Sequence, residues 1–271
     1  MDLNDRTAVV TGAASGIGLA LTKRFLREGM SVVMADIEAD VLDTEATKIA
    51  EAGGRVRPVV CDVSDPGQIA DLRDQALTTF GAVHVLCNNA GVASGRPNLK
   101  SRPAEWQWVI GVNVLGVAYG VSAFAPLMVE QGEGHIVNTA SEAGLTSSPM
   151  LGSYHASKYA VVGLSESLAL ELAGTGVGVS CLCPELVNTK IFESTRNAPE
   201  ALGLGAPAPV AMADLEKLMG TVAMDPADVA ADVAYAIRAD QFWILTHSAT
   251  QARVQQRNDG LEAGRNPGMK R

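Results

Sequence analysis

Short apolar runs alternate with longer amphipathic segments along most of the chain. The runs, rich in Val, Ile, Ala and Cys, cover residues 7–10, 31–35, 56–60, 83–87, 135–139, 178–183 and 242–245. The segments between them carry apolar residues at the three-to-four-residue spacing of a helix face. Strands that alternate with helices are typical of βαβ units. The pattern predicts one α/β domain over residues 1–271, with a doubly wound, seven-stranded, mostly parallel sheet and helices on both faces.

The same pattern, together with glycines and prolines, sets the expected helix boundaries. We predict helices over residues 17–28, 66–80, 103–131, 152–172 and 227–238, one that ends near residue 52, and one in the tail to about residue 263. Gly53-Gly54 is expected to end the second helix of the chain. Pro126 is expected to bend the long helix, since proline cannot donate the helical hydrogen bond.

Two segments break the alternation. Residues 184–225 form a long connection rich in Ala, Pro, Gly and Met, and connections of this length are usually functional or disordered. It begins beyond the carboxyl end of a strand, where ligands bind in such sheets. We therefore interpret it as a substrate loop or lid, with a surface insertion as the alternative. Residues 247–271 form an arginine-rich tail, for which a subunit contact is compatible with the sequence but not shown by it.

Glycines cluster where the first strand meets its helix. Gly12, Gly16 and Gly18 stand there, with Ser15 and Ile17 between them. Small residues let the backbone approach a pyrophosphate, and the helix N-terminus offers N–H groups and the positive end of its dipole. Because the loop lies between a strand and a helix, it predicts a dinucleotide site. This feature makes the predicted domain Rossmann-like.

Asp36 ends the second strand, eighteen residues after Gly18. A carboxylate at this place accepts hydrogen bonds from the ribose hydroxyls of NAD and repels the 2′-phosphate of NADP. No basic residue is adjacent in sequence, since Ile37 follows and Ser15 occupies the loop position where one could help NADP. NAD is therefore predicted over NADP, and the alternative for Asp36 is a solvated turn residue.

Two more strand ends fall on the same edge of the predicted sheet. Asp62 and Val63 follow the third strand, where Asp62 can accept a hydrogen bond from an adenine amino group. Asn89, Ala90 and Gly91 follow the fourth strand, where small residues leave room for the adenosine half of a cofactor. All five are assigned to the cofactor site.

The strongest indication of a catalysed reaction comes from three residues, Ser141, Tyr154 and Lys158. Tyr and Lys four residues apart share one helix face, so the ammonium of Lys158 should favour the phenolate and lower the pKa of Tyr154. Such a phenol acts as general base on an alcohol or general acid on a ketone. Ser141 follows an apolar strand, from which its hydroxyl can hold a substrate oxygen near Tyr154. The same spacing occurs by chance in many helices, but the glycine loop in this chain favours catalysis.

The net charge, the hydropathy and the cysteines indicate which partners, locations and metal sites are not expected. The net charge of −9 argues against nucleic acid as a partner. No apolar run of ~18 residues lacks polar interruption and no N-terminal signal is visible, so neither a membrane span nor secretion is expected. Cys61, Cys87, Cys181 and Cys183 are predicted to be buried, reduced thiols in a cytoplasmic protein. The histidines form no cluster, and no metal site is expected.

Taken together, these motifs resemble the short-chain dehydrogenase/reductase family over about residues 5–189. The resemblance implies that Tyr154 is the acid/base, that Lys158 lowers its pKa and binds the nicotinamide ribose, and that Ser141 positions the substrate. It also implies that Asn113 completes a proton relay through water to Lys158. A polar residue that bends the long helix is the alternative for Asn113.

The resemblance extends, with departures, to the segment after the sixth strand. Pro184, Val187 and Thr189 match the part that meets the nicotinamide carboxamide in this family. The glycine that commonly follows the proline is replaced by Glu185, and Glu142 stands where a small residue usually follows the serine. Each carboxylate is expected either to contact a polar substrate or to face solvent.

The sequence thus predicts an NAD-dependent oxidoreductase that interconverts a secondary alcohol and a ketone. A medium-sized hydrophobic substrate, cyclic, aromatic or steroid-like, is favoured by the apolar residues of the 184–225 segment: Leu202, Leu204, Val210, Met212, Leu215, Leu218 and Met219. Family members are mostly dimers or tetramers, so a homodimer or homotetramer, paired through the long helix and the catalytic helix, is expected.

Three alternatives remain. An NADPH-dependent oxoacyl-type reductase is disfavoured by Asp36. A non-catalytic nucleotide-binding protein on the same fold would have a broken Ser–Tyr–Lys set, and here the set is intact. A lyase-like relative with a filled cofactor site would need bulky residues in the glycine loop.

Overall fold

A seven-stranded sheet forms the centre of the computed structural model, which describes residues 1–94, 98–203 and 223–267. The strand order is β3-β2-β1-β4-β5-β6-β7, and every neighbouring pair is parallel. The strands are β1 Thr7–Thr11, β2 Ser31–Asp36, β3 Val56–Val60, β4 Val85–Asn88, β5 Gly134–Thr139, β6 Val177–Leu182 and β7 Trp243–Ile244. The predicted doubly wound sheet is confirmed, and it is parallel throughout. Its order reverses between β1 and β4, where ligands bind in such sheets.

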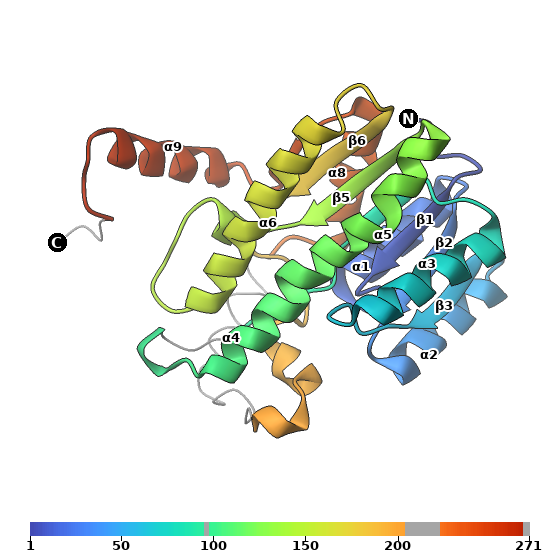
Figure 1. Ribbon diagram of the computed structural model, residues 1–271, viewed down its shortest axis with the longest axis horizontal. Coiled ribbons are helices and arrows are strands. Elements are labelled where there is room, and N and C mark those ends of the chain that lie inside the picture. Colours follow the sequence, from blue (N-terminus) through green and yellow to red (C-terminus); the bar gives the residue numbers. More distant parts are fainter. Residues whose placement is uncertain (95–97, 204–222, 268–271) are drawn as a thin grey trace.

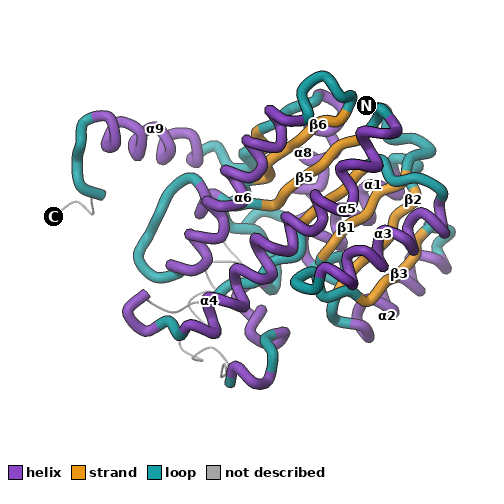
Figure 2. The backbone as a smooth tube through the Cα atoms, viewed as in Figure 1, coloured by secondary structure: helices purple, strands orange, loops and turns teal. Residues whose placement is uncertain are grey.

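Helices cover both faces of this sheet (Figures 1 and 2). One face carries α1 Gly16–Arg27, α2 Ala39–Glu51 and α8 Pro226–Ala239, and the other α3 Pro66–Phe80, α5 Gly116–Gln131 and α6 Gly152–Glu171. Each layer has its own apolar core. Phe25, Leu42 and Val233 are buried in the first, and Leu72 and Phe124 in the second. The strands β1, β2, β4 and β5 are buried along their whole length, which explains why they are apolar rather than alternating, whereas the edge strand β3 has exposed residues.

The long helix predicted over 103–131 is continuous but irregular. It consists of α4 Pro103–Ile110, a π-helical turn Gly111–Leu115, and α5. The irregularity lies at the π-turn, and Pro126 lies inside α5. This wider turn carries Asn113, and single π-turns are frequent at functional sites. Hydrogen bonds from Asn113 to the backbone of Val92 hold the turn against the end of β4.

By length and composition alone, the stretch Pro103–Gln131 could cross a membrane, with a mean hydropathy of 1.7. Core helices of soluble proteins pass the same test. In this fold α5 packs against α3, β4 and β5. The apolar character of the helix therefore has an explanation in the packing of the domain.

Beyond β6 the chain leaves the regular alternation. It forms short 3₁₀ segments, η4 Ile191–Asn197 and η5 Glu200–Leu202, before α8. Of the apolar residues expected to form a lid, Leu202 ends η5; Leu204, Val210, Met212, Leu215, Leu218 and Met219 lie outside the described residues. After β7, α9 Ala249–Glu262 confirms the predicted tail helix and extends away from the body of the molecule (Figure 1).

Candidate active site

A cavity of about 1680 Å³ opens along the carboxyl edge of the sheet. It exceeds the roughly 300–1,000 Å³ of common small-molecule pockets, so it has room for a dinucleotide together with a substrate. Most of the predicted site residues line it: Gly12, Ser15, Gly16, Ile17, Asp36, Asp62, Val63, Asn89, Ala90, Gly91, Ser141, Tyr154, Lys158, Pro184, Val187 and Thr189. Gly18 and Asn113 instead lie behind the wall, where both are buried.

The glycine loop is built so closely that side chains would not fit. Gly12 has φ +67° and Gly16 φ +52°, a left-handed backbone that favours glycine. A Cβ on Gly12 would lie 2.9 Å from the Cα of Ala90, and one on Gly16 3.0 Å from Cγ2 of Thr189. One on Gly18 would lie 2.0 Å from the carbonyl oxygen of Gly12. The loop therefore exposes bare backbone in front of the α1 N-terminus, and this cradle fits a pyrophosphate.

Asp36 is fixed at the far end of this loop. Its Oδ2 accepts the N–H of Ala14 at 2.9 Å and its Oδ1 that of Glu38 at 3.0 Å. Burial raises the pKa of this carboxyl, and the backbone hydrogen bonds act in the opposite direction. Asp36 is thus fixed at the cavity wall by two backbone hydrogen bonds.

Two other residues that were predicted to bind the cofactor also form local hydrogen bonds. Oδ1 of Asp62 accepts hydrogen bonds from the N–H and the hydroxyl of Ser64, at 2.9 and 2.7 Å. The side-chain amide of Asn89 donates to the carbonyl of Thr11 at 2.9 Å, and its backbone N–H donates to the Thr11 hydroxyl. These bonds join the ends of β1 and β4, so Asn89 shapes the floor of the cavity.

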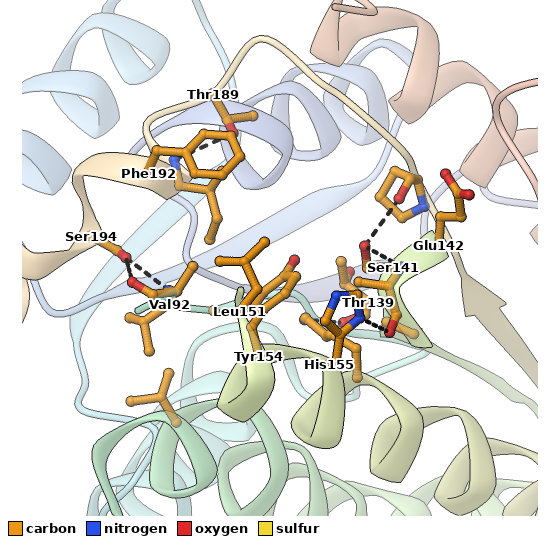
Figure 3. A pocket seen from close by; sticks show the side chains of 18 of the residues that line it. Val92, Thr139, Ser141, Glu142, Leu151, Tyr154, His155, Thr189, Phe192 and Ser194 are labelled. Carbon is orange, nitrogen blue, oxygen red and sulfur yellow. Dashed lines mark hydrogen bonds between the residues drawn. The ribbon is translucent and has the colours of Figure 1, made fainter. Parts of the chain in front are cut away.

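Ser141, Tyr154 and Lys158 are brought together from the end of β5 and the first turns of α6. The Ser141 hydroxyl donates to the carbonyl of Pro184 at 3.2 Å, and accepts the N–H of Ala143 at 3.1 Å. Figure 3 shows the side chains of Ser141 and Tyr154 directed into the same space. Nζ of Lys158 donates to the carbonyl of Thr139 at 2.8 Å and lies 5.5 Å from the centroid of the Tyr154 ring.

The electrostatics of this group differ from the expectation based on spacing. Burial raises the pKa of the Tyr154 phenol, and the hydrogen bond with Ser141 offsets only part of this effect. Burial also lowers the pKa of Lys158 to about 8. The expected lowering of the Tyr154 pKa by Lys158 is therefore not found, because removal from water disfavours both charged forms.

The pKa of Lys158 predicts a measurable pH dependence of stability. An ammonium buried in the folded protein but free in the unfolded chain destabilises the fold at low pH. The unfolded chain binds more protons between pH 8 and the ordinary lysine pKa of 10.5, so this cost disappears as pH rises through that window. The free energy of unfolding of the wild type should rise relative to that of Lys158→Met by up to about 3 kcal/mol. Denaturant titrations of both proteins at pH 7.5 to 10.5 measure this difference; a constant difference would contradict the assignment.

Asn113 supports the site from behind. Its Nδ2 donates to the carbonyl of Val92 at 2.9 Å and to the Ser157 hydroxyl at 3.0 Å, while its Oδ1 accepts the Val92 N–H at 2.8 Å. A Cβ added to Gly91 would lie 3.5 Å from Oδ1 of Asn113 and 3.6 Å from Nζ of Lys158. The two polar groups thus flank Gly91, and a relay between them through water stays a prediction.

Glu142 and Glu185, the two departures from the family pattern, share one arginine. Arg253 of α9 forms ion pairs with both: Nη2 lies 2.8 Å from Oε2 of Glu142 and 2.5 Å from Oε2 of Glu185, and Nε also contacts Glu142. Glu142 is buried next to Ser141. Instead of contacting only solvent, the two carboxylates hold α9 against the edge of the sheet where Ser141 lies. The sequence contained the arginine-rich tail but no signal for this pairing.

A second arginine that the sequence analysis did not identify lies at the end of the cavity that contains Asp36. Arg196 of η4 lines the same cavity as Asp36 and forms an ion pair with Glu38. No basic residue neighbours Asp36 in sequence, but the fold brings Arg196 to Glu38, which is 158 residues away in the chain and two residues after Asp36.

Comparison with known proteins agrees with this geometry. Residues 6–200 match the model of the short chain dehydrogenase family. The chain is similar to 1-deoxy-11-beta-hydroxypentalenate dehydrogenase of Streptomyces exfoliatus, with 36% identity over 96% of this chain and 90% of the relative. It is 35% identical to a 3-oxoacyl-acyl-carrier-protein reductase of Thermotoga maritima, over 71% of this chain and 78% of that protein.

A solved structure resembles the whole chain. The crystal structure of a short-chain dehydrogenase/reductase from Burkholderia phymatum in complex with NAD superposes with a TM-score of 0.95 and 42% identity, covering 100% of this chain and 99% of that one. The glycine cradle, the Ser141–Tyr154–Lys158 group and these likenesses lead to one conclusion. The chain belongs to the short-chain dehydrogenase/reductase family and is an oxidoreductase that acts on CH–OH groups.

Proposed function

We propose that this protein is an NAD-dependent dehydrogenase that interconverts a secondary alcohol and a ketone of medium size and largely hydrophobic character. One observation carries the proposal. A single cavity holds Ser141, Tyr154 and Lys158 together with Asp36, and the glycine loop lies along it. A dinucleotide bound by its ribose at Asp36 and by its pyrophosphate at the loop would extend toward Tyr154. The NAD-bound relative supports the choice of cofactor.

The residues of the chain supply binding, orientation and proton transfer. Bound NAD would supply the hydride acceptor. The Ser141 hydroxyl would hold the substrate oxygen beside Tyr154, whose phenolate accepts the hydroxyl proton in oxidation and whose phenol returns it in reduction. Burial raises the pKa of Tyr154, so the phenol is protonated at neutral pH and prepared for ketone reduction. Alcohol oxidation, which needs the phenolate, is expected to accelerate as pH rises.

The walls of the described cavity support an apolar substrate. Its apolar lining on the catalytic side consists of Val92, Trp108, Val112, Leu151, Leu186, Ile191 and Phe192. Figure 3 shows Leu151 and Phe192 around the space in front of Tyr154. Polar contacts to the reacting oxygen would come from Ser141 and Tyr154, and the apolar side chains would contact the body of the substrate. This arrangement fits a compact hydrophobic body with one hydroxyl or carbonyl group.

Exposed apolar residues on two helices support the further proposal of self-association. Leu115 and Val129 on the long helix are 41% and 39% exposed, and Leu170 on α6 is 80% exposed. We propose that these helices pair with their copies in a homodimer or homotetramer.

The cofactor choice is tested by calorimetric titration with NADH and NADPH. The wild type should bind NADH more tightly. Asp36→Asn should reduce the NADH preference about tenfold or more, because a charged hydrogen bond to ribose and a repulsion of the 2′-phosphate are both lost. Asp40→Asn, which removes the same charge on α2 outside the cavity, should leave the preference unchanged. Tighter binding of NADPH by the wild type would favour the oxoacyl-type reductase instead.

A further inference from the structure

Glu38 and Arg196 form an ion pair across the cofactor end of the cavity. Nε of Arg196 lies 2.9 Å from Oε1 of Glu38, and Nη2 lies 2.8 Å from Oε2. The third guanidinium nitrogen, Nη1, donates to the carbonyl of Lys190 at 3.2 Å. Glu38 stands two residues after Asp36, and its backbone N–H donates to Oδ1 of Asp36. The pair thus touches the residue that should recognise the ribose.

The pair is charged and well oriented. The side chains are 32% and 21% exposed, so neither is fully solvated. The hydrogen bond with Arg196 lowers the pKa of Glu38, and the same bond raises the pKa of Arg196. A bidentate guanidinium–carboxylate contact is among the strongest pairings of side chains. Each of the three guanidinium nitrogens donates one hydrogen bond to the protein, two of them to Glu38, so the side chain is held in place by Glu38 and the Lys190 carbonyl.

These contacts matter because a guanidinium is the group best suited to bind a phosphate. NADP differs from NAD by a 2′-phosphate on the adenosine ribose, the part that Asp36 should meet. An arginine that lines the cavity near Asp36 would ordinarily favour NADP. In this chain the arginine is occupied by Glu38, whose own charge adds to the repulsion of a phosphate.

We propose that Glu38 is a second determinant of cofactor selectivity, acting by holding Arg196 away from a 2′-phosphate. The proposal rests on the proposed function, in which Asp36 binds the adenosine ribose of NAD. Selectivity then depends on two carboxylates, one that binds the hydroxyls of the correct cofactor and one that prevents a basic residue from accepting the wrong one. This second element joins β2 to a segment far along the chain, which sequence proximity to Asp36 does not reveal.

The test is calorimetric titration of the full-length protein with NAD⁺ and NADP⁺. Glu38→Gln should tighten NADP⁺ binding by about tenfold or more, because Arg196 becomes available for a charged hydrogen bond. NAD⁺ affinity should change much less, since Asp36 is intact. In the double variant Glu38→Gln/Arg196→Met the gain should disappear. Glu45→Gln, on the same helix and ion-paired with Lys48 away from the cavity, is the matched control and should bind both nucleotides as the wild type does.

The outcomes separate this inference from the proposed function. Unchanged NADP⁺ affinity in Glu38→Gln would overturn the inference alone, and so would a gain that persists in the double variant, because repulsion without Arg196 would then explain it. A wild type that binds NADP⁺ more tightly, or neither nucleotide, would overturn both. Thermal unfolding of each variant confirms that it is folded before titration.

Discussion

Tyr154→Phe should lower the turnover number by about 10²–10⁴-fold, the usual contribution of a positioned acid–base group. The change removes one oxygen atom. The ring of Tyr154 stays packed at the start of α6, and Lys158 retains its hydrogen bond to Thr139. Ser141 retains its bond to Pro184 and can still orient a substrate. What is lost is the phenol oxygen in front of Ser141, and with it the proposed route for the hydroxyl proton.

Binding and turnover should separate in this variant. NADH affinity should be that of the wild type, because the glycine loop and Asp36 are unchanged. Tyr235→Phe is the matched control: Tyr235 lies on α8, is 65% exposed and should be dispensable. Steady-state kinetics with a secondary alcohol and NAD, alongside a cofactor titration, measure both quantities. Near-normal turnover of Tyr154→Phe would exclude the mechanism proposed for this site.

Most of the fold could be predicted from the chain because it depends on local pattern. Buried parallel strands are apolar along their length, and amphipathic helices separate them. The seven strands and the helices around them were placed within a few residues on this basis. The π-turn at 111–115 was not predicted, because it depends on a tertiary contact. Asn113 bonds the backbone of Val92, and no periodicity in the helix itself records this interaction.

In the candidate site, too, residues that belong to local motifs could be predicted, and residues that depend on tertiary contacts could not. Gly12, Asp36, Ser141 and Tyr154 each follow from a local motif, and the topology of a parallel sheet brings strand ends to one edge. Residues that act through pairing over long sequence distances were missed. Arg253 and Arg196 each meet their carboxylates only because loops beyond β6 and β7 return to the sheet edge. The pKa of Tyr154 also escaped prediction, since burial rather than helix spacing sets its direction.

Gly18→Ala should disable cofactor binding although it adds a single methyl group. The new Cβ would lie 2.0 Å from the Gly12 carbonyl oxygen and 2.7 Å from its carbon. These are backbone atoms of the loop itself, so no flexible side chain can move to relieve the collision. Gly12 must shift, and overpacking of this kind costs about 1–3 kcal/mol of stability. The shift also displaces the backbone that faces the pyrophosphate, so NADH affinity should fall at least about tenfold, or ~1.4 kcal/mol.

The control for Gly18→Ala comes from another helix. Gly163 lies within α6 with nothing within 4 Å of its Cβ position. Gly163→Ala should therefore keep full NADH affinity and gain up to about 1 kcal/mol, because alanine favours the helix more than glycine does. Calorimetric titration and thermal unfolding of both variants give the comparison. If Gly18→Ala matched the wild type in affinity and stability, the loop could not be packed as closely as it is described. Its loss of binding beside an intact Gly163→Ala would show that the backbone of the glycine loop, rather than any side chain, forms the pyrophosphate site.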